Sequence, residues 1–325
     1  MGMEYIIGFI VLVAAEGAFL VLSRRRHVGA AVTARSSHTC VTPTAGGIAF
    51  ILAAAACVVF NHALMSTAAW VTAGAALLLG AVSFADDMRP LPWLPRLLAQ
   101  VAAVTAAYWF ICPGEPAWVM PVAAFGALAF INSLNFLDGI RCMLGFYALV
   151  AVATLWYVLG SAACAGMPSQ PLLTQLCLWM MLGIGAFLAF NLSDSIFCGD
   201  TGSVFAGFII SVLLTAVILY TGDITYLTLV IVCLCDTALT TVLRLFSGKN
   251  IFKPHRTFLY QLLTTRFRWT HMRTATVYAA LQLVINLIFL RTPLSGRLPF
   301  LITIAILLSL IHLAVRRRAE AIKGL

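Results

Sequence analysis

The sequence has 325 residues, of which 62% are hydrophobic and only 10% are charged. A chain of this composition has too few charged side chains to cover a water-soluble fold, so a soluble globular protein is excluded and the lipid bilayer is the expected solvent. The net charge of +9 follows from membrane topology, which gathers Lys and Arg on one side, and gives no reason to expect nucleic acid as a partner.

Apolar runs of about 20 residues, the length that a membrane-spanning helix needs, recur along the whole chain. We place eleven of them, at 4–22, 45–61, 67–85, 95–112, 117–136, 142–160, 172–192, 203–221, 224–246, 274–290 and 298–315. These runs are too long and too continuously apolar for the strands of a membrane barrel. The sequence therefore predicts an all-α integral membrane protein with about eleven transmembrane helices, forming a single domain over residues 1–325.

The basic residues predict how these helices are oriented. With a periplasmic N-terminus and a cytoplasmic C-terminus, 18 of the 20 Lys and Arg residues fall on the cytoplasmic side, and only Arg291 and Arg297 fall outside. One span more or fewer would invert every later loop. We therefore expect a multi-pass membrane protein with cytoplasmic loops near 23–44, 86–95, 137–141, 193–202 and 247–273.

The third apolar run ends in two adjacent aspartates, Asp86 and Asp87. Neighbouring carboxylates repel each other, and a membrane interface tolerates them poorly without a cation or a chemical task. They are therefore candidate catalytic residues. An isolated pair of aspartates is also common in solvated turns, and that interpretation stays open at this point.

Three polar residues spaced three apart, Asn132, Asn135 and Asp138, close the fifth apolar run. This spacing places them on one face of the last helical turns, where they can converge on one ligand. The amides can bind a sugar or a base, and Asp138 adds a carboxylate for a metal or a hydroxyl group. An ordinary helix end capped by Asn and Gly explains the same pattern equally well.

Asn191 ends the seventh run, and Asp200 follows it in a glycine-containing segment just before the eighth run. Such a segment turns backbone N–H groups and a helix N-terminus toward an anion. A carboxylate in this setting is explained if it holds Mg²⁺ that bridges to phosphate oxygens. Asp200 is therefore the candidate metal ligand.

The loop at 247–273 carries Lys253, His255 and Arg256, which are residue types that neutralise phosphate charge. Phosphoryl transfer requires three kinds of group: carboxylates for a metal, cations for phosphates, and amides for a sugar or base. The sequence contains all three. All of them fall at predicted cytoplasmic helix ends, which favours an enzyme. A transporter would need polar groups at mid-depth, and Glu16 and Asp236 keep that alternative open.

Five motifs resemble, in the same order, those of the polyprenyl-phosphate N-acetylhexosamine-1-phosphate transferases, which are glycosyltransferases of family 4. They are Pro43-Thr44-Ala45-Gly46-Gly47, Asp86-Asp87, Asn132 to Gly139, Phe190-Asn191 followed by Phe197-Cys198-Gly199-Asp200-Thr201-Gly202-Ser203, and His255-Arg256 with Tyr260-Gln261. The chain departs from the family pattern where Arg141 stands in place of a carboxylate and Phe258 in place of a second histidine.

The resemblance implies an eleven-span fold in the bacterial inner membrane, and an activity that depends on Mg²⁺, with Mn²⁺ as a substitute. It further implies a UDP-activated N-acetylhexosamine or deoxy-amino-hexose donor, and undecaprenyl phosphate in the membrane lipid as acceptor. The products would be the undecaprenyl-diphospho-sugar and UMP, for O-antigen or another surface polysaccharide. The oligomeric state, including a homodimer, stays open.

The resemblance also implies a role for each matching residue. Asp200 would hold the metal, and Asp86 or Asp87 would deprotonate or orient the acceptor phosphate. His255 and Arg256 would neutralise the diphosphate. The donor site would be shaped by the remaining polar residues, Asn132, Asn135, Asp138 and Asn191. A related enzyme, the phospho-MurNAc-pentapeptide transferase of peptidoglycan synthesis, is a weaker alternative because its histidine-rich last loop is absent here.

Overall fold

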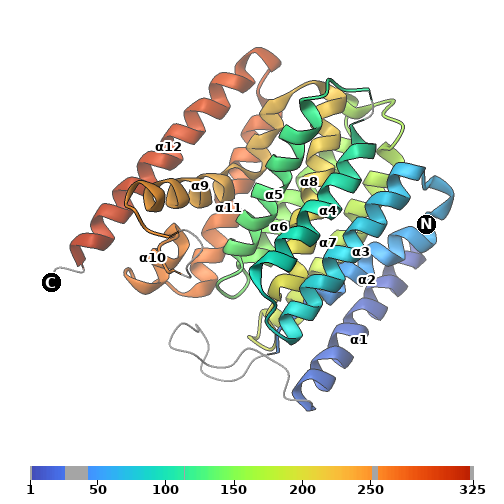
Figure 1. Ribbon diagram of the computed structural model, residues 1–325, viewed down its shortest axis with the longest axis horizontal. Helices are drawn as coiled ribbons and strands as arrows, with labels where there is room; N and C mark the ends of the chain where they lie inside the picture. The colour runs from blue at the N-terminus through green and yellow to red at the C-terminus, as the bar shows by residue number, and fades with distance from the viewer. Residues whose placement is uncertain (1, 26–42, 113, 251–254, 323–325) are drawn as a thin grey trace. The chain divides into compact units, whose positions relative to one another are not determined.

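The computed structural model describes residues 2–25, 43–112, 114–250 and 255–322. Its described residues form helices, turns and loops, with no strand among them. The helices group into two compact units, residues Met1–Asp223 and Ile224–Leu325, each of which is considered by itself (Figure 1). The expectation of a single domain therefore stays a prediction, whereas the all-α architecture is confirmed.

In its described residues, the first unit holds eight α-helices and two short 3₁₀ turns. They are α1 (Met3–Arg25), α2 (Ile48–Phe60), η1 (His62–Leu64), α3 (Thr67–Met88), α4 (Trp93–Ile111), α5 (Val119–Leu137), α6 (Met143–Leu159), η2 (Ala162–Cys164), α7 (Gln170–Asn191) and α8 (Gly199–Thr221). Helix α8 lies inside this unit and contacts α2, α3, α4, α5 and α6. Its most apolar stretch is 78% buried, so α8 is the core helix around which its neighbours pack.

The second unit holds one 3₁₀ helix and four α-helices: η3 (Ile224–Val230), α9 (Ile231–Phe246), α10 (Leu259–Thr265), α11 (His271–Arg291) and α12 (Leu294–Ala321). Helix α10 lies within the expected loop 247–273, which is therefore not entirely irregular. Thr270 starts α11 as an N-cap, since its hydroxyl accepts a hydrogen bond from Arg273 N at 3.2 Å.

The predicted spans coincide with helices in the described part of the chain. Nine segments are long and apolar enough to cross a membrane, and the shorter apolar helices α2 and α6 bring the total to the eleven predicted positions. This confirms a multi-span helical membrane protein. The side of the membrane that each end faces stays a prediction.

The ninth span differs from one continuous α-helix, because its first third, η3, is a 3₁₀ helix. Two buried amides of α11 satisfy the backbone where the helix type changes. Gln282 accepts a hydrogen bond from Val232 N at 2.9 Å and donates one to Thr228 O at 2.9 Å, while Asn286 accepts one from Gln282 at 2.7 Å. Irregular backbone at membrane depth is tolerated only with such partners, which residue spacing alone did not reveal.

Candidate active site

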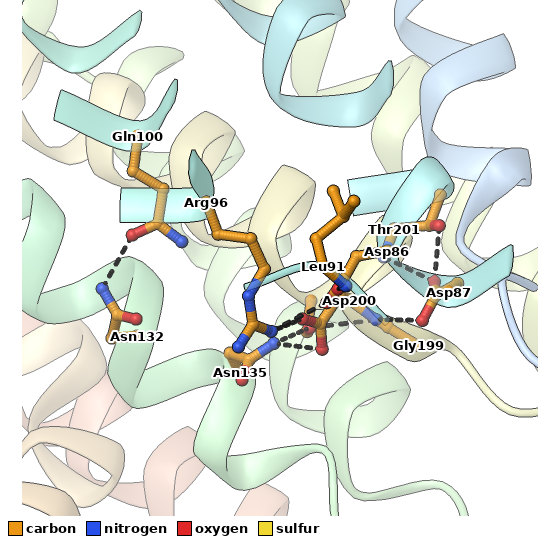
Figure 2. A network of polar contacts seen from close by, with 11 residues as sticks. Asp86, Asp87, Leu91, Arg96, Gln100, Asn132, Asn135, Gly199, Asp200 and Thr201 are labelled. Atoms are coloured by element: carbon orange, nitrogen blue, oxygen red, sulfur yellow. Dashed lines mark hydrogen bonds and ion pairs between the residues drawn. The ribbon is translucent and has the colours of Figure 1, made fainter. Parts of the chain in front are cut away.

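The carboxylates of the first unit meet where the end of α3 approaches the start of α8. Asp86 and Asp87 lie in the last turn of α3, and Asp200 lies in the first turn of α8. We expected all three at helix ends or in the loops near 86–95 and 193–202, and the structure places them in the terminal turns of the helices. The helices extend further because the aspartates are held by specific partners at the helix ends, as Figure 2 shows.

Arg96 joins two of these carboxylates. Its Nη1 atom lies 2.7 Å from Asp86 Oδ2 and 3.0 Å from Asp200 Oδ2 (Figure 2). Sequence reasoning counted Arg96 only as a basic residue of the cytoplasmic side and missed this role. The available signal was its position in the first turn of α4, just after the short turn that follows Asp86-Asp87, because a tight helical hairpin brings those two ends together.

Asp87 binds the N-terminus of α8. Its Oδ1 accepts a hydrogen bond from Asp200 N at 3.1 Å, and its Oδ2 accepts bonds from Thr201 N at 2.9 Å and Thr201 Oγ1 at 2.6 Å. The first N–H groups of a helix have no partner within the helix and carry partial positive charge, which a carboxylate offsets. A Cβ atom at Gly199, whose φ is +72°, would lie 2.4 Å from Asp87 Oδ2, so only glycine permits this approach.

Two residues at the end of α5 complete the cluster. Asn135 donates hydrogen bonds from Nδ2 to Asp200 Oδ1 at 2.8 Å and to Ser203 Oγ at 2.9 Å. Asp138, the residue after α5, accepts a bond from Gly199 N at 3.1 Å. Burial, reinforced by the nearby carboxylates of the cluster, raises the pKa of Asp138 to about 8.

Asn132 lies apart from the carboxylates in Figure 2. It donates hydrogen bonds to Gln100 Oε1 at 3.0 Å and to Leu128 O at 2.8 Å, which ties α5 to α4. Of the three polar residues spaced three apart, the structure thus brings Asn135 and Asp138 to the cluster. The predicted substrate contact of Asn132 stays a prediction.

Asn191 has a buried side chain, only 3% exposed, and bonds to the backbone of two loops. Its Oδ1 accepts a hydrogen bond from Cys142 N at 2.8 Å, and its Nδ2 donates one to Ile196 O at 2.7 Å. Cys142 has a positive φ of +64°. With both amide atoms occupied, Asn191 can shape the donor site by fixing these loops, and direct contact with a substrate stays a prediction.

The Pro43–Gly47 motif packs directly on the segment that leads into α8. Gly46 N donates to Phe197 O at 2.9 Å, and Gly47 N donates to Cys198 O at 3.0 Å. A Cβ atom built on Gly47 would lie 2.0 Å from the Cα atom of Gly202, so the two backbones touch. Two motifs that lie far apart in the sequence therefore support the same helix end.

His255 and Arg256 belong to the second unit, and Lys253 lies outside the described residues. His255 Nδ1 is 2.9 Å from the Thr257 hydroxyl. Burial, with help from Arg244 and Arg316, lowers the pKa of His255 to about 4, so the ligand-free protein holds a neutral imidazole at neutral pH. The expectation that these residues act together with the carboxylates of the first unit stays a prediction.

The residues present fit a magnesium ion that is shared with a substrate. No group of three or more His, Cys, Asp or Glu that could hold a metal occurs within the described ranges. Magnesium in phosphate-transferring enzymes usually needs only one or two carboxylates, with substrate oxygens and water completing the shell. Asp86 and Asp200 supply two carboxylate oxygens that already converge on one cationic nitrogen, that of Arg96.

A helical membrane protein with aspartates, an asparagine and an arginine gathered at helix ends has the groups that handle phosphates in a bilayer enzyme. The family model described as "Glycosyl transferase family 4" matches residues 69–218, which supports membership of the chain in this family. Family members are sugar-phosphate transferases, so the match supports a polyprenyl-phosphate sugar-phosphate transferase in general. No curated protein matches the sequence.

The matched segment covers most of α3 and all but the last turn of α8, with the helices between them. It therefore contains the whole carboxylate cluster together with Arg96 and Asn135. His255 and Arg256 lie beyond its end, so the family match does not bear on their role.

Proposed function

We propose that the protein transfers N-acetylhexosamine 1-phosphate, or a deoxy-amino-hexose 1-phosphate, from a UDP-sugar to undecaprenyl phosphate in the bacterial inner membrane. The observation that supports this proposal is the convergence of Asp86 and Asp200 from two helix ends, with Arg96 and Asn135 bound to them. The products are the undecaprenyl-diphospho-sugar and UMP. The reaction would begin the synthesis of O-antigen or another surface polysaccharide, with the site facing the cytoplasm.

The reaction exchanges one phosphoanhydride bond for another. An oxygen of the acceptor phosphate forms a bond to the phosphorus that carries the sugar, and the bond from that phosphorus to the UMP oxygen breaks. No water or redox partner is consumed. Catalysis of such a step depends on positioning the two phosphates and on neutralising their charge.

The residues of the cluster divide this work in our proposal. Asp86 orients the acceptor phosphate, while Asp87 holds the N-terminus of α8 in place. Asp200 and Asp86 would hold the divalent cation, which supplies charge neutralisation at the donor diphosphate when bound. Asn135 fixes the orientation of Asp200.

The other predicted residues act on the donor in this proposal. Lys253, His255 and Arg256 would bind the diphosphate, and Asn132 and Asp138 would face the sugar nucleotide. A diphosphate beside His255 would raise its pKa from the low value of the ligand-free protein, because a nearby anion favours the protonated imidazole. Asn191 would keep the supporting loops in place.

The direct test uses purified full-length protein with Mg²⁺, undecaprenyl phosphate and a panel of UDP-N-acetylhexosamines. Release of UMP together with a lipid-linked diphospho-sugar is the expected result. Protein shown to be folded that releases no UMP with any donor would overturn the proposal. Release only with UDP-MurNAc-pentapeptide would assign the chain to peptidoglycan synthesis instead.

The metal requirement is tested by Asp200→Asn. We expect this variant to stay folded and to lose at least about 100-fold in Mg²⁺-dependent turnover, because a carboxylate ligand is worth several kcal/mol of charge stabilisation. Chelation should abolish turnover of the wild type, and Mn²⁺ should restore it in part. Normal turnover of Asp200→Asn at ordinary Mg²⁺ concentrations would exclude the metal role of Asp200.

A further inference from the structure

We propose that Arg96 is an exchangeable counter-ion, which competes with a divalent cation for Asp86 and Asp200 and turns to substrate phosphate when the cation binds. The inference rests on the proposed function, because the cation and the phosphates are those of the transfer reaction. It assigns a charge-exchange role to a residue at the start of α4.

The geometry that supports this role is the sharing of one nitrogen atom. Arg96 Nη1 alone contacts both carboxylates, at 2.7 Å from Asp86 Oδ2 and 3.0 Å from Asp200 Oδ2. An arginine that served only as a structural clamp would favour the two-pronged contact in which two of its nitrogens bind two oxygens of one carboxylate. Here a single positive point lies between two oxygens from different helices, as a bound cation would.

Each carboxylate is also held by its other oxygen. Asp86 Oδ1 accepts a hydrogen bond from Leu91 N at 2.5 Å, and Asp200 Oδ1 accepts one from Asn135 Nδ2 at 2.8 Å. These partners are neutral and do not depend on Arg96. Both Oδ2 atoms would therefore stay directed toward the same region after Arg96 leaves.

The charges and the exposure favour exchange. Asp86 and Asp200 with Arg96 carry a net charge of −1, so they attract a further cation when both aspartates are ionised. The Arg96 side chain is 39% exposed, whereas Asp86 is 10% exposed, so the arginine is the member of the pair with room to move. A partly exposed ion pair is weak enough for a divalent ion to displace it. The released guanidinium then adds a positive charge beside the incoming phosphates.

The test measures metal binding without lipid or sugar nucleotide. Arg96→Gln removes the competing cation, so its affinity for Mn²⁺, followed by electron paramagnetic resonance, should rise roughly tenfold above that of the wild type. Mg²⁺ should displace the bound Mn²⁺ in both proteins. An affinity in Arg96→Gln that is unchanged or weaker than in the wild type would overturn the proposal.

Arg141→Gln is the matched control. Arg141 also forms an ion pair in the first unit, with Asp194 at 2.8 Å, whereas the ion-pair partner of Asp86 and Asp200 in the described chain is Arg96. Its Mn²⁺ affinity should equal that of the wild type. A similar rise in Arg141→Gln would show a general effect of lost positive charge and would also overturn the exchange role.

Two further variants keep the test decisive. If Arg96→Gln fails to fold only because the two carboxylates repel each other, Mg²⁺ should restore its folding. Arg96→Lys retains the positive charge, so its affinity for Mn²⁺ should equal that of the wild type or be slightly higher. In the double variant Arg96→Gln/Asp86→Asn the gain in affinity should disappear. Persistence of the gain without the Asp86 carboxylate would contradict a site shared by Asp86 and Asp200.

This experiment separates the inference from the proposed function. Tighter metal binding in Arg96→Gln without UMP release by the wild type would support the exchange and contradict the transferase. If the wild type releases UMP but Arg96→Gln binds metal with unchanged affinity, the transferase is supported and the exchange role of Arg96 is contradicted. If both hold, Arg96→Gln should bind metal more tightly and turn over more slowly, a combination that a purely structural role does not produce.

Discussion

Asp86 and Asp87 are adjacent in the sequence, but their partners give them different tasks. Asp87 uses both oxygens to bind N–H and O–H groups at the start of α8. Asp86 instead faces Arg96, a side chain that can move. Of the two aspartates, Asp86 is therefore the better candidate for contact with the acceptor phosphate, and Asp87 for positioning.

The two asparagine variants should separate these roles. Asp86→Asn should keep the wild-type melting temperature and lose about 100-fold in kcat, because the acceptor phosphate is no longer held in position. In Asp87→Asn the free energy of unfolding should fall by roughly 1.5–3 kcal/mol, because charge-assisted hydrogen bonds to the helix end are lost. Thermal unfolding in detergent and UMP release measure both effects. Equal stability of the two variants would contradict the division of roles.

The pKa of His255 gives a prediction for stability at acid pH. Its pKa is lowered from 6.5 to about 4 in the folded protein. Between these values the unfolded chain binds a proton that the folded chain does not, so stability is complete above about pH 6.5 and falls as the pH drops toward 4. His255→Gln should therefore lose less stability than the wild type over this range.

The melting temperatures of both proteins between pH 4.5 and pH 7.5 test this prediction. As the pH is lowered, the melting temperature of the wild type should fall by a few degrees more than that of the variant. Other acid-sensitive groups affect both proteins equally, so the difference reports His255. Parallel curves would show that His255 does not change its protonation on unfolding.

Arg141 shows how a departure from the family pattern can be accommodated. This arginine stands where the family has a carboxylate, and its Nη1 lies 2.8 Å from Asp194 Oδ2. Asp194 has a positive φ of +56°, so the loop bends sharply at this residue. The added positive charge is thus offset within the first unit, and it leaves the carboxylate cluster with its own partners.

At the scale of helices, the start of α8 is the element on which the site depends. It is held by Asp87 from α3, by Asp138 from the end of α5, and by the Pro43–Gly47 segment. The close approach of Gly47 to Gly202 makes this packing sensitive to a single methyl group. The elements that carry the reactive groups are therefore fixed before any substrate binds.

Two glycine-to-alanine variants test this packing. At Gly47 the new Cβ would meet Gly202 backbone at 2.0 Å, so Gly47→Ala should destabilise the protein by about 3 kcal/mol or more and abolish turnover. At Gly74, in the exposed part of α3, a Cβ meets nothing within 4 Å. Gly74→Ala should therefore stabilise the helix by roughly 0.5–1 kcal/mol. Melting temperatures that move in the same direction would contradict the packing described here.

At the scale of the whole molecule, the polar groups of the first unit gather at one end of its helices. Asp86 and Asp87 end α3, Asp138 follows α5, and Asp200 begins α8, so antiparallel helices bring these ends together. This one-sided distribution suits an enzyme that meets a water-soluble donor at the membrane surface.

The predicted topology can be tested by labelling exposed serines converted to cysteine. Ser247→Cys, after α9, should react with a membrane-impermeant maleimide only in permeabilised cells, because its loop is predicted to be cytoplasmic. Ser169→Cys, before α7, should react in intact cells. The native cysteines of the described chain are mostly buried, which keeps the background low. The opposite labelling pattern would reverse the predicted orientation.

The sequence by itself determined the class of the molecule and the position of its helices. Long apolar runs have few ways to satisfy their backbone in a bilayer, so their length and spacing predict helices directly. The residue types of the site were also visible, because charged groups such as Asp86 and Asp200 are costly at a membrane interface and therefore conspicuous.

Only the tertiary structure decided which partner each polar residue has. Arg96 looked like one more cytoplasmic arginine, and its place between two aspartates depends on how α3, α4 and α8 pack. Asp87 and Asn191 looked equivalent to their neighbours until their hydrogen bonds to backbone groups were known. Such contacts join residues far apart in the chain, and they follow from side-chain geometry in three dimensions, which local sequence patterns do not encode.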